Sequence, residues 1–186
     1  MKKMQLFQVI VFVLIATSLY GSVALKLSNK EMSEKADEII IGTVKNISYI
    51  FDEKQQTPYT ISTITVEKWI KGNSKEREIK IRQIGGKINN QHLFITGDAK
   101  LKEGERVLLF LSRGEEFRFI LALSQAKFSV IKDEKTGEEK VLRDISQLGL
   151  GSFDKEGKMV VENPVAEQPV PLKDFIREIE SYISKK

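Results

Sequence analysis

The chain has 186 residues, with 30 basic against 26 acidic side chains, one histidine and no cysteine. The absence of cysteine excludes disulfides, thiol nucleophiles and cysteine-based metal sites. The nearly balanced charge does not favour nucleic acid as a partner, and none is expected. A chain of this length can form one domain with a substantial core.

Residues 1–24 have the pattern of a secretory signal. Two lysines precede an apolar run at residues 6–19, and Ser22-Val23-Ala24 supplies the small residues that signal peptidase requires. The run of about 14 residues is shorter than the roughly 20 that span a bilayer. We therefore expect cleavage near Ala24 and an exported protein, periplasmic or extracellular. The alternative is an uncleaved N-terminal segment, which would then be the only contact with a membrane.

A short helix and two long strands are predicted next. Ser28-Asn29-Lys30-Glu31 has the capping-box pattern, so a helix is expected from there to about Asp37. Residues 38–49 are β-branched and then alternating, which predicts a strand with a bend or bulge at Gly42. Residues 59–70 predict a second strand, and the phase change of its apolar positions indicates a bulge.

The middle of the chain predicts further strands. Residues 78–84 alternate, and Gly85-Gly86 ends that strand before a long connection at residues 87–99. Within the connection we expect one short extended piece at residues 92–96. Residues 106–111 are apolar on both faces and should form a central strand. Additional strands are predicted at residues 117–123, 127–131 and 139–142.

The C-terminal part predicts a hairpin at residues 152–161, a proline-rich tether at residues 163–171 and an amphipathic helix that starts at Pro171. The expected fold is mainly β: a small OB-like barrel, closed or partly open, with a short N-terminal helix and the C-terminal helix. The predicted boundaries are 1–24 for the signal, 25–145 for the barrel, 146–171 for the hairpin and tether, and 172–186 for the helix.

Residues 36–44, Tyr59, Lys71-Gly72, Gly85-Gly86, Gly97, residues 104–111 and residues 125–128 together resemble a family of uncharacterised exported prokaryotic proteins. The resemblance covers about residues 36–131 and implies no activity. More distantly, Ala36-Asp37 before an Ile-rich strand, with the later Lys71-Gly72, is similar to the netrin-like domain of tissue inhibitors of metalloproteinases. That resemblance implies an OB barrel. The inhibitors use an N-terminal cysteine to chelate zinc, and this chain has no cysteine.

No catalytic residue, metal site or cofactor is predicted. His92 is the only histidine, no serine has a nucleophile-elbow context, and a zinc site requires three or four ligands. Paired carboxylates such as Glu103 and Glu105 lie in glycine-containing turns, where charge keeps loops solvated. Residues 133–138 only loosely approximate a calcium loop.

Four residues form the candidate ligand-binding set. Tyr59 and Trp69 are expected to pack in the core, with a stacking platform for sugars or bases as the alternative. Lys80 and Arg82 are expected to project together from a solvated barrel face, with contact to an acidic envelope polymer or a protein partner as the alternative. A groove lined by such residues would indicate a non-catalytic exported binding module, with an envelope or extracellular protein or glycan as partner. An exposed apolar loop near residues 87–97 would instead indicate an inhibitor of an extracellular hydrolase or protease, acting by blockage.

Overall fold

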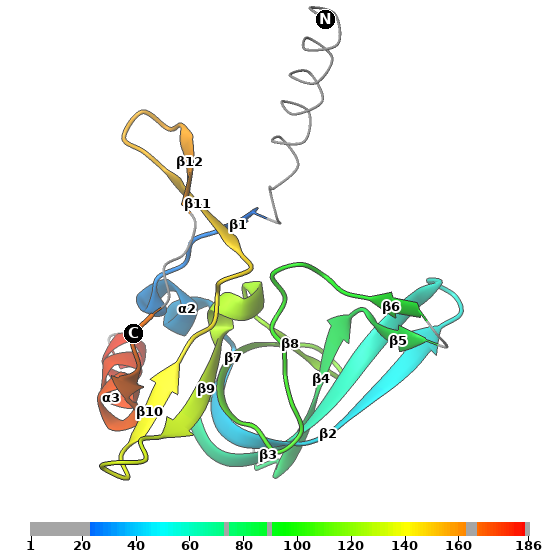
Figure 1. The fold of residues 1–186 in the computed structure, drawn as a ribbon, viewed down its shortest axis with the longest axis horizontal. Helices are drawn as coiled ribbons and strands as arrows, with labels where there is room; N and C mark the ends of the chain where they lie inside the picture. Colours follow the sequence, from blue (N-terminus) through cyan, green and yellow to red (C-terminus); the bar gives the residue numbers. More distant parts are fainter. Residues whose placement is uncertain (1–22, 73–74, 89–90, 163–166, 185–186) are drawn as a thin grey trace, which may run out of the picture.

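The computed structural model describes residues 23–72, 75–88, 91–162 and 167–184. The described chain is mainly β, with a short N-terminal helix and a C-terminal helix, which confirms the predicted fold class. An eight-stranded sheet has the order β13-β10-β9-β7-β2-β3-β4-β8 and curls until β8 also pairs with β7. Figure 1 shows this barrel-like body with both helices on one side. No helix in the described ranges is long and apolar enough to cross a membrane.

The first helix, α2 (Asn29–Lys35), has the predicted capping box. The Ser28 hydroxyl accepts a hydrogen bond from the Glu31 amide at 3.2 Å, and the Glu31 carboxylate accepts one from the Ser28 amide at 2.8 Å. These contacts satisfy amides that have no partner within the helix. The helix buries Met32 and is followed by Ala36, which is also buried. The predicted extent was slightly too long, since the helix ends at Lys35.

The long strands β2 (Glu38–Asp52) and β3 (Thr57–Lys71) pair antiparallel and form most of the barrel wall. Their register shifts near Ile39, Ile41 and Val44, so the predicted bulging is confirmed. A Cβ atom on Gly42 would lie 2.5 Å from the carbonyl oxygen of Thr65. The sequence therefore has glycine where the two backbones approach closely.

The barrel continues through β4 (Glu78–Ile84), β7 (Arg106–Arg113) and β8 (Arg118–Ile120). The strand β7 is buried on both faces, as its apolar sequence predicts. One face of β7 joins the interior with β2, β3 and β4, and the other packs toward the helices. The strand β8 pairs with β7 and meets β4 through a single residue pair, Ile81 with Arg118. The barrel is therefore not closed.

Two predictions for the middle of the chain were wrong in detail. The connection after Gly85 contains a small hairpin, β5 (Gly86–Ile88) and β6 (Gln91–Leu93), instead of one extended piece at residues 92–96. The strand expected at residues 117–123 is only three residues long. It stops early because Ala122 and Leu123 have φ angles of 52° and 59°, which lie outside the strand region. A 3-10 turn, η1 (Leu123–Ala126), follows.

The C-terminal helix packs on the outer face of the barrel. The hairpin β9 (Lys127–Lys132) and β10 (Glu139–Leu142) extends the sheet beyond β7, and β13 (Val170–Pro171) pairs with β10. The helix α3 (Leu172–Ile183) then buries Phe175 and Ile179 against a core that includes Met32 and Phe128. Residues 163–166 of the predicted tether and residues 185–186 lie outside the described ranges.

A second, three-stranded sheet projects from the body (Figure 1). Its middle strand, β11 (Gly149–Phe153), pairs antiparallel with β12 (Met159–Glu162) and parallel with β1 (Val23–Leu25). The predicted hairpin is confirmed. The strand β1 spans the predicted cleavage point at Ala24, and the rest of the predicted signal, residues 1–22, lies outside the described ranges.

Candidate functional site

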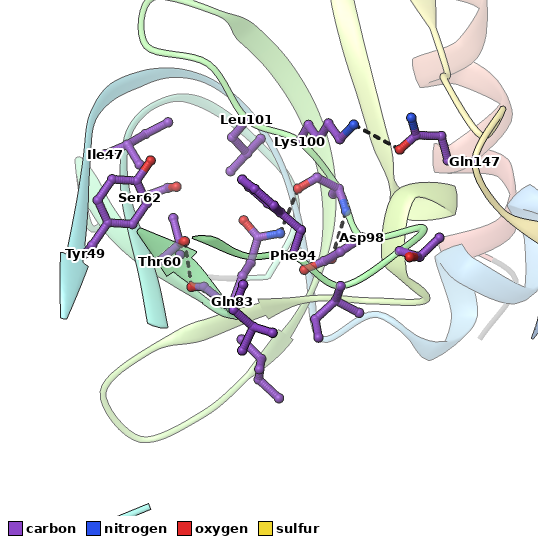
Figure 2. Close-up of a pocket in the computed structure, with 17 residues that line it drawn as sticks. Ile47, Tyr49, Thr60, Ser62, Gln83, Phe94, Asp98, Lys100, Leu101 and Gln147 are labelled. Atoms are coloured by element: carbon purple, nitrogen blue, oxygen red, sulfur yellow. Dashed lines mark hydrogen bonds between the residues drawn. The ribbon is translucent and has the colours of Figure 1, made fainter. Parts of the chain in front are cut away.

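A cavity of about 360 Å³ lies where the body of the barrel meets the segment 93–101. In Figure 2, Tyr49 and Ser62 lie on one side of this cavity, Asp98 and Lys100 lie on the other, and Phe94 lies between them. The strands β2, β3 and β4 all contribute to the wall, which is mostly apolar. Its apolar side chains are those of Ile47, Tyr49, Ile84, Leu93, Phe94, Ile95, Ala99 and Leu101.

Two glycines allow the chain to turn at the edge of the cavity. Gly85 has a φ of +102°, and a Cβ atom there would lie 2.6 Å from the carbonyl oxygen of Leu93. A Cβ atom on Gly86 would lie 2.8 Å from the ring of Tyr49. The Thr60 hydroxyl donates a hydrogen bond of 2.9 Å to the Gly85 carbonyl and ties the turn to β3. The glycine pair therefore brings β5 and β6 against the barrel wall.

The segment 93–101 is held over the barrel by polar contacts. The side-chain amide of Gln83 donates a hydrogen bond of 2.8 Å to the Ala99 carbonyl. The Gly97 carbonyl accepts a hydrogen bond of 3.1 Å from the amide of Ser124. The ammonium group of Lys100 donates to the side chain of Gln147 at 2.9 Å. These three contacts join the cavity wall to β4, η1 and the loop before β11.

The carboxyl group of Asp98 has a perturbed pKa. Burial raises the pKa above its usual value, while hydrogen bonds from the Ala99 amide and from the Gln83 side chain act in the opposite direction. The Ala99 amide lies 2.8 Å from the Asp98 carboxylate. Removal of water from a carboxylate disfavours its charged form. The cavity thus contains an acid that is more easily protonated than an exposed aspartate.

A second cavity, of about 270 Å³, adjoins the first and shares Gln83, Ile84, Ile95 and Asp98 with it. Tyr59 and Arg82 also line this second cavity. The guanidinium carbon of Arg82 lies 4.9 Å from the ring centre of Tyr59, 5.1 Å from that of Phe117 and 5.2 Å from that of Phe119. Within the described ranges, Arg82 has no carboxylate partner. Its guanidinium instead lies against aromatic faces, which attract cations.

Two buried polar atoms at these cavities have no hydrogen-bond partner in the described ranges. They are the Ser62 hydroxyl oxygen, which belongs to the wall of the first cavity, and Nε of Arg82 at the second. Buried polar groups are nearly always paired in folded proteins. The two atoms therefore offer hydrogen-bonding capacity to whatever enters.

The four residues predicted from sequence separate in the structure. Tyr59 and Arg82 meet at the second cavity, where Tyr59 is buried and its hydroxyl donates to the Gln55 side chain. Trp69 packs against the barrel interior and Lys80 is exposed, and neither lines the two cavities. Tyr59 and Trp69 therefore do not form a shared stacking surface at either cavity.

Sequence reasoning did not name Ser62, Gln83, Phe94 or Asp98, although it considered an exposed apolar loop near residues 87–97, the segment that contains Phe94. The one available signal was the apolar triplet Leu93-Phe94-Ile95 in an otherwise polar connection. All three side chains are exposed, and Phe94 is 72% exposed, although its ring stacks on that of His92 at 5.6 Å. An exposed aromatic residue on a loop beside a cavity is a common feature of binding sites.

In the part of the chain that the structure describes, no cluster of three or more histidine, aspartate or glutamate side chains is arranged to hold a metal ion. No protein-family model matches the chain, and no curated protein sequence matches it either. The residues of the site can accept apolar groups, and they can form a hydrogen bond or an ion pair with a polar one.

Proposed function

We propose that the protein is a non-catalytic binding module that acts outside the cytoplasm, and that its ligand is a segment of another polypeptide. The observation that carries the proposal is the apolar cavity of about 360 Å³ next to the exposed Phe94. Its volume lies within the roughly 300–1,000 Å³ typical of ligand sites. The signal pattern of residues 1–24 supports the proposed location.

The lining residues indicate a ligand with a bulky apolar side chain. Leu93, Phe94 and Ile95 form an exposed apolar rim, and Ile47 and Leu101 line the cavity behind it. An apolar group that moves from water into such a cavity contributes about 25 cal/mol for each Å² of area buried. The Ser62 hydroxyl has no hydrogen-bond partner among the described residues, and it would gain one from a polar group of the same ligand.

Arg82 indicates that the ligand also carries an acidic group. Its guanidinium lies near three aromatic rings and has no carboxylate partner in the described ranges. Arg82 lines the second cavity, and its Nε atom has no hydrogen-bond partner among the described residues. Arginine binds carboxylates through directed, charge-assisted hydrogen bonds. Since the two cavities share four wall residues, an apolar side chain and a nearby carboxylate of one peptide would fill them together.

The fold proposed for this module is an OB-type barrel. The pairing order β7-β2-β3-β4-β8, with β8 parallel to β4 and antiparallel to β7, supports this assignment. OB barrels present ligands to one side of a curved sheet and its adjoining loops. The proposed site uses β3, β4 and the adjoining segment 93–101 in a comparable way.

A second candidate function is inhibition of an extracellular hydrolase or protease. It is favoured by the exposed triplet Leu93-Phe94-Ile95, because an apolar loop that projects from a rigid barrel can fill the cleft of an enzyme. Such an inhibitor would act by blockage. Titration of extracellular proteases with the protein tests this function, which requires stoichiometric inhibition that is lost in Phe94→Ser.

Selection from a random peptide library on the immobilised full chain tests the binding function. Enriched peptides should carry a large apolar residue near Asp, Glu or a C-terminal carboxylate. Phe94→Ser should weaken their binding roughly tenfold, which corresponds to about 1.4 kcal/mol. The matched control Phe153→Ser removes another exposed phenylalanine, on the projecting sheet, and should leave the affinity unchanged.

The role of Arg82 is tested with the same peptides. Arg82→Gln should weaken binding and remove its salt dependence, whereas Lys80→Gln, two residues away on β4, should weaken it little. Lys80 is an apt control because it lines neither cavity. The absence of any enriched peptide, or equal losses in Phe94→Ser and Phe153→Ser, would refute the proposed function.

A further inference from the structure

The projecting three-stranded sheet has one apolar face that nothing in the described ranges covers. Residues alternate between the faces along a strand, and paired residues share a face. The register pairs Phe153 with Met159 and Gly151 with Val161, and it places Leu25 beside Gly151. The exposed side chains on this face, which we call the arm face, are Val23, Leu25, Phe153, Met159 and Val161.

The composition of the arm face differs from that of its reverse. No charged residue of β1, β11 or β12 lies on the arm face, because Glu162 pairs with Leu150 on the other side. Glycines at positions 149 and 151 occupy the middle strand, so the neighbouring apolar side chains define a shallow surface. The reverse side packs Leu150 and Ala24 against Leu148 and Ile145 of the body. The arm is therefore a supported sheet with one apolar side presented outward.

The residues before the arm are apolar as well. The apolar run at residues 6–19 ends four residues before Val23, the first arm-face residue. Four residues span at most about 14 Å. If the apolar run at residues 6–19 enters an apolar environment such as a membrane, that environment must lie within about 14 Å of Val23 on the arm face. The run of about 14 residues is too short to span a bilayer comfortably, so additional apolar contact would strengthen its attachment.

The first strand also connects this segment firmly to the folded domain. The Gln125 side chain accepts a hydrogen bond from the Leu27 amide at 2.9 Å and donates one to the Leu25 carbonyl at 3.0 Å. The Lys26 amide donates to the Gly151 carbonyl at 2.8 Å. Cleavage after Ala24 would remove two of the three residues of β1 and the packing of Ala24.

We propose that the arm face rests on a lipid bilayer and that residues 1–24 remain attached and hold it there. The occupant of the arm face is thus the interfacial region of the membrane, where apolar groups are buried about 5–10 Å deep. The arm then orients the barrel, with the cavities at Phe94 and Arg82 available to partners outside the bilayer.

Site-specific fluorescence tests this contact, because a chain without cysteine accepts a single engineered label. Val161→Cys and Val160→Cys form a matched pair: the residues are neighbours on β12 and are 43% and 41% exposed, on opposite faces. Each full-length variant is labelled with nitrobenzoxadiazole and reconstituted with phosphatidylcholine–phosphatidylglycerol vesicles. The label at position 161 should brighten at least about twofold, shift to the blue and be quenched by brominated lipid, as expected for interfacial burial. The label at position 160 should not. Phe153→Cys provides a second arm-face position.

Three results would overturn the proposal. The first is equal emission from positions 160 and 161 with vesicles present, repeated with Phe153→Cys. The second is a label at position 161 that is shielded before vesicles are added and more so at higher protein concentration, which would assign the arm face to a second copy of the chain. The third is an intact mass of the native membrane-fraction protein that lacks residues 1–24.

Discussion

The carboxylate of Glu38 and the guanidinium of Arg118 meet inside the protein, with Oε2 3.0 Å from Nε and side chains only 3% and 7% exposed. Glu38 begins β2, and Arg118 begins β8. Arg118 is also the residue through which β8 meets Ile81 of β4, and it binds Glu76 at 2.7 Å. The ion pair therefore lies at the incompletely closed seam of the barrel and fixes β8 in place.

Glu38→Gln should destabilise the protein by about 3 kcal/mol, because Arg118 loses its buried carboxylate partner and keeps the partly exposed Glu76. Glu78→Gln is the matched control, since it breaks an exposed pair with Lys45 and should cost less than about 1 kcal/mol. Urea unfolding of both variants measures the two free energies. Similar losses in the two variants would show that the seam does not depend on the buried pair.

Docking of α3 should contribute strongly to stability. The ring of Phe175 lies 4.7 Å from that of Phe128, and Phe175 is buried. Phe175→Ala should therefore lower the free energy of unfolding by about 3–5 kcal/mol. Lys173→Ala, exposed on the same helix, should change it by less than about 0.5 kcal/mol. A loss of helical circular dichroism without a change in the main unfolding midpoint would mean that α3 folds separately from the barrel.

Gly42→Ala should destabilise the long hairpin. The added Cβ atom would lie 2.5 Å from the Thr65 carbonyl oxygen and 2.7 Å from a methyl group of Ile64. The backbone of β3 must move to relieve these contacts, and such overpacking costs about 1–3 kcal/mol. Thermal unfolding provides the measurement. An unchanged melting temperature would indicate that β2 and β3 adjust freely at this bulge.

The stability contributed by Asp98 should fall as the pH rises. Burial raises the pKa of Asp98. At pH values between the pKa of the unfolded state and the raised pKa of the folded state, the folded state therefore binds more protons than the unfolded state. The contribution is fully present below the pKa of the unfolded state and is lost as the pH passes through the raised pKa of the folded state. Asp98→Asn cannot titrate at this position and serves as the reference.

Melting temperatures of the wild type and Asp98→Asn, measured between about pH 3 and pH 7, test this sign. The stability of the wild type relative to the variant should decrease with increasing pH. A difference that stays constant, or that increases with pH, would contradict a raised pKa for the buried carboxyl group.

The strands and helices with strong local patterns were predictable from the sequence. Alternating and β-branched residues identified β2, β3 and β4, the capping box at Ser28 identified α2, and the apolar stripe identified α3. The short strand β8 was overestimated, because Ala122 and Leu123 have positive φ angles, which alanine and leucine rarely adopt and which the apolar pattern does not predict. The hairpin of β5 and β6 was missed, since strands of three residues leave almost no alternation to detect.

The candidate site was less predictable than the fold. Tyr59 and Arg82 were both among the four candidate ligand-binding residues, but only the structure shows that they contact each other. Trp69 belongs to the same strand as Tyr59, but bulges in the β2–β3 pairing change which face its later residues occupy. Ser62 and Asp98 line the same cavity only because the segment 93–101 folds over the barrel. No local sequence pattern predicts that tertiary contact.

The distance of 80 residues along the chain between Glu38 and Arg118 has a kinetic consequence. During synthesis, Glu38 at the start of β2 emerges well before Arg118. The ion pair at the seam therefore cannot form until the nascent chain has passed residue 118. Non-local pairings of this kind slow folding. The unfinished polypeptide should thus remain open for longer than a chain whose barrel closes through local contacts.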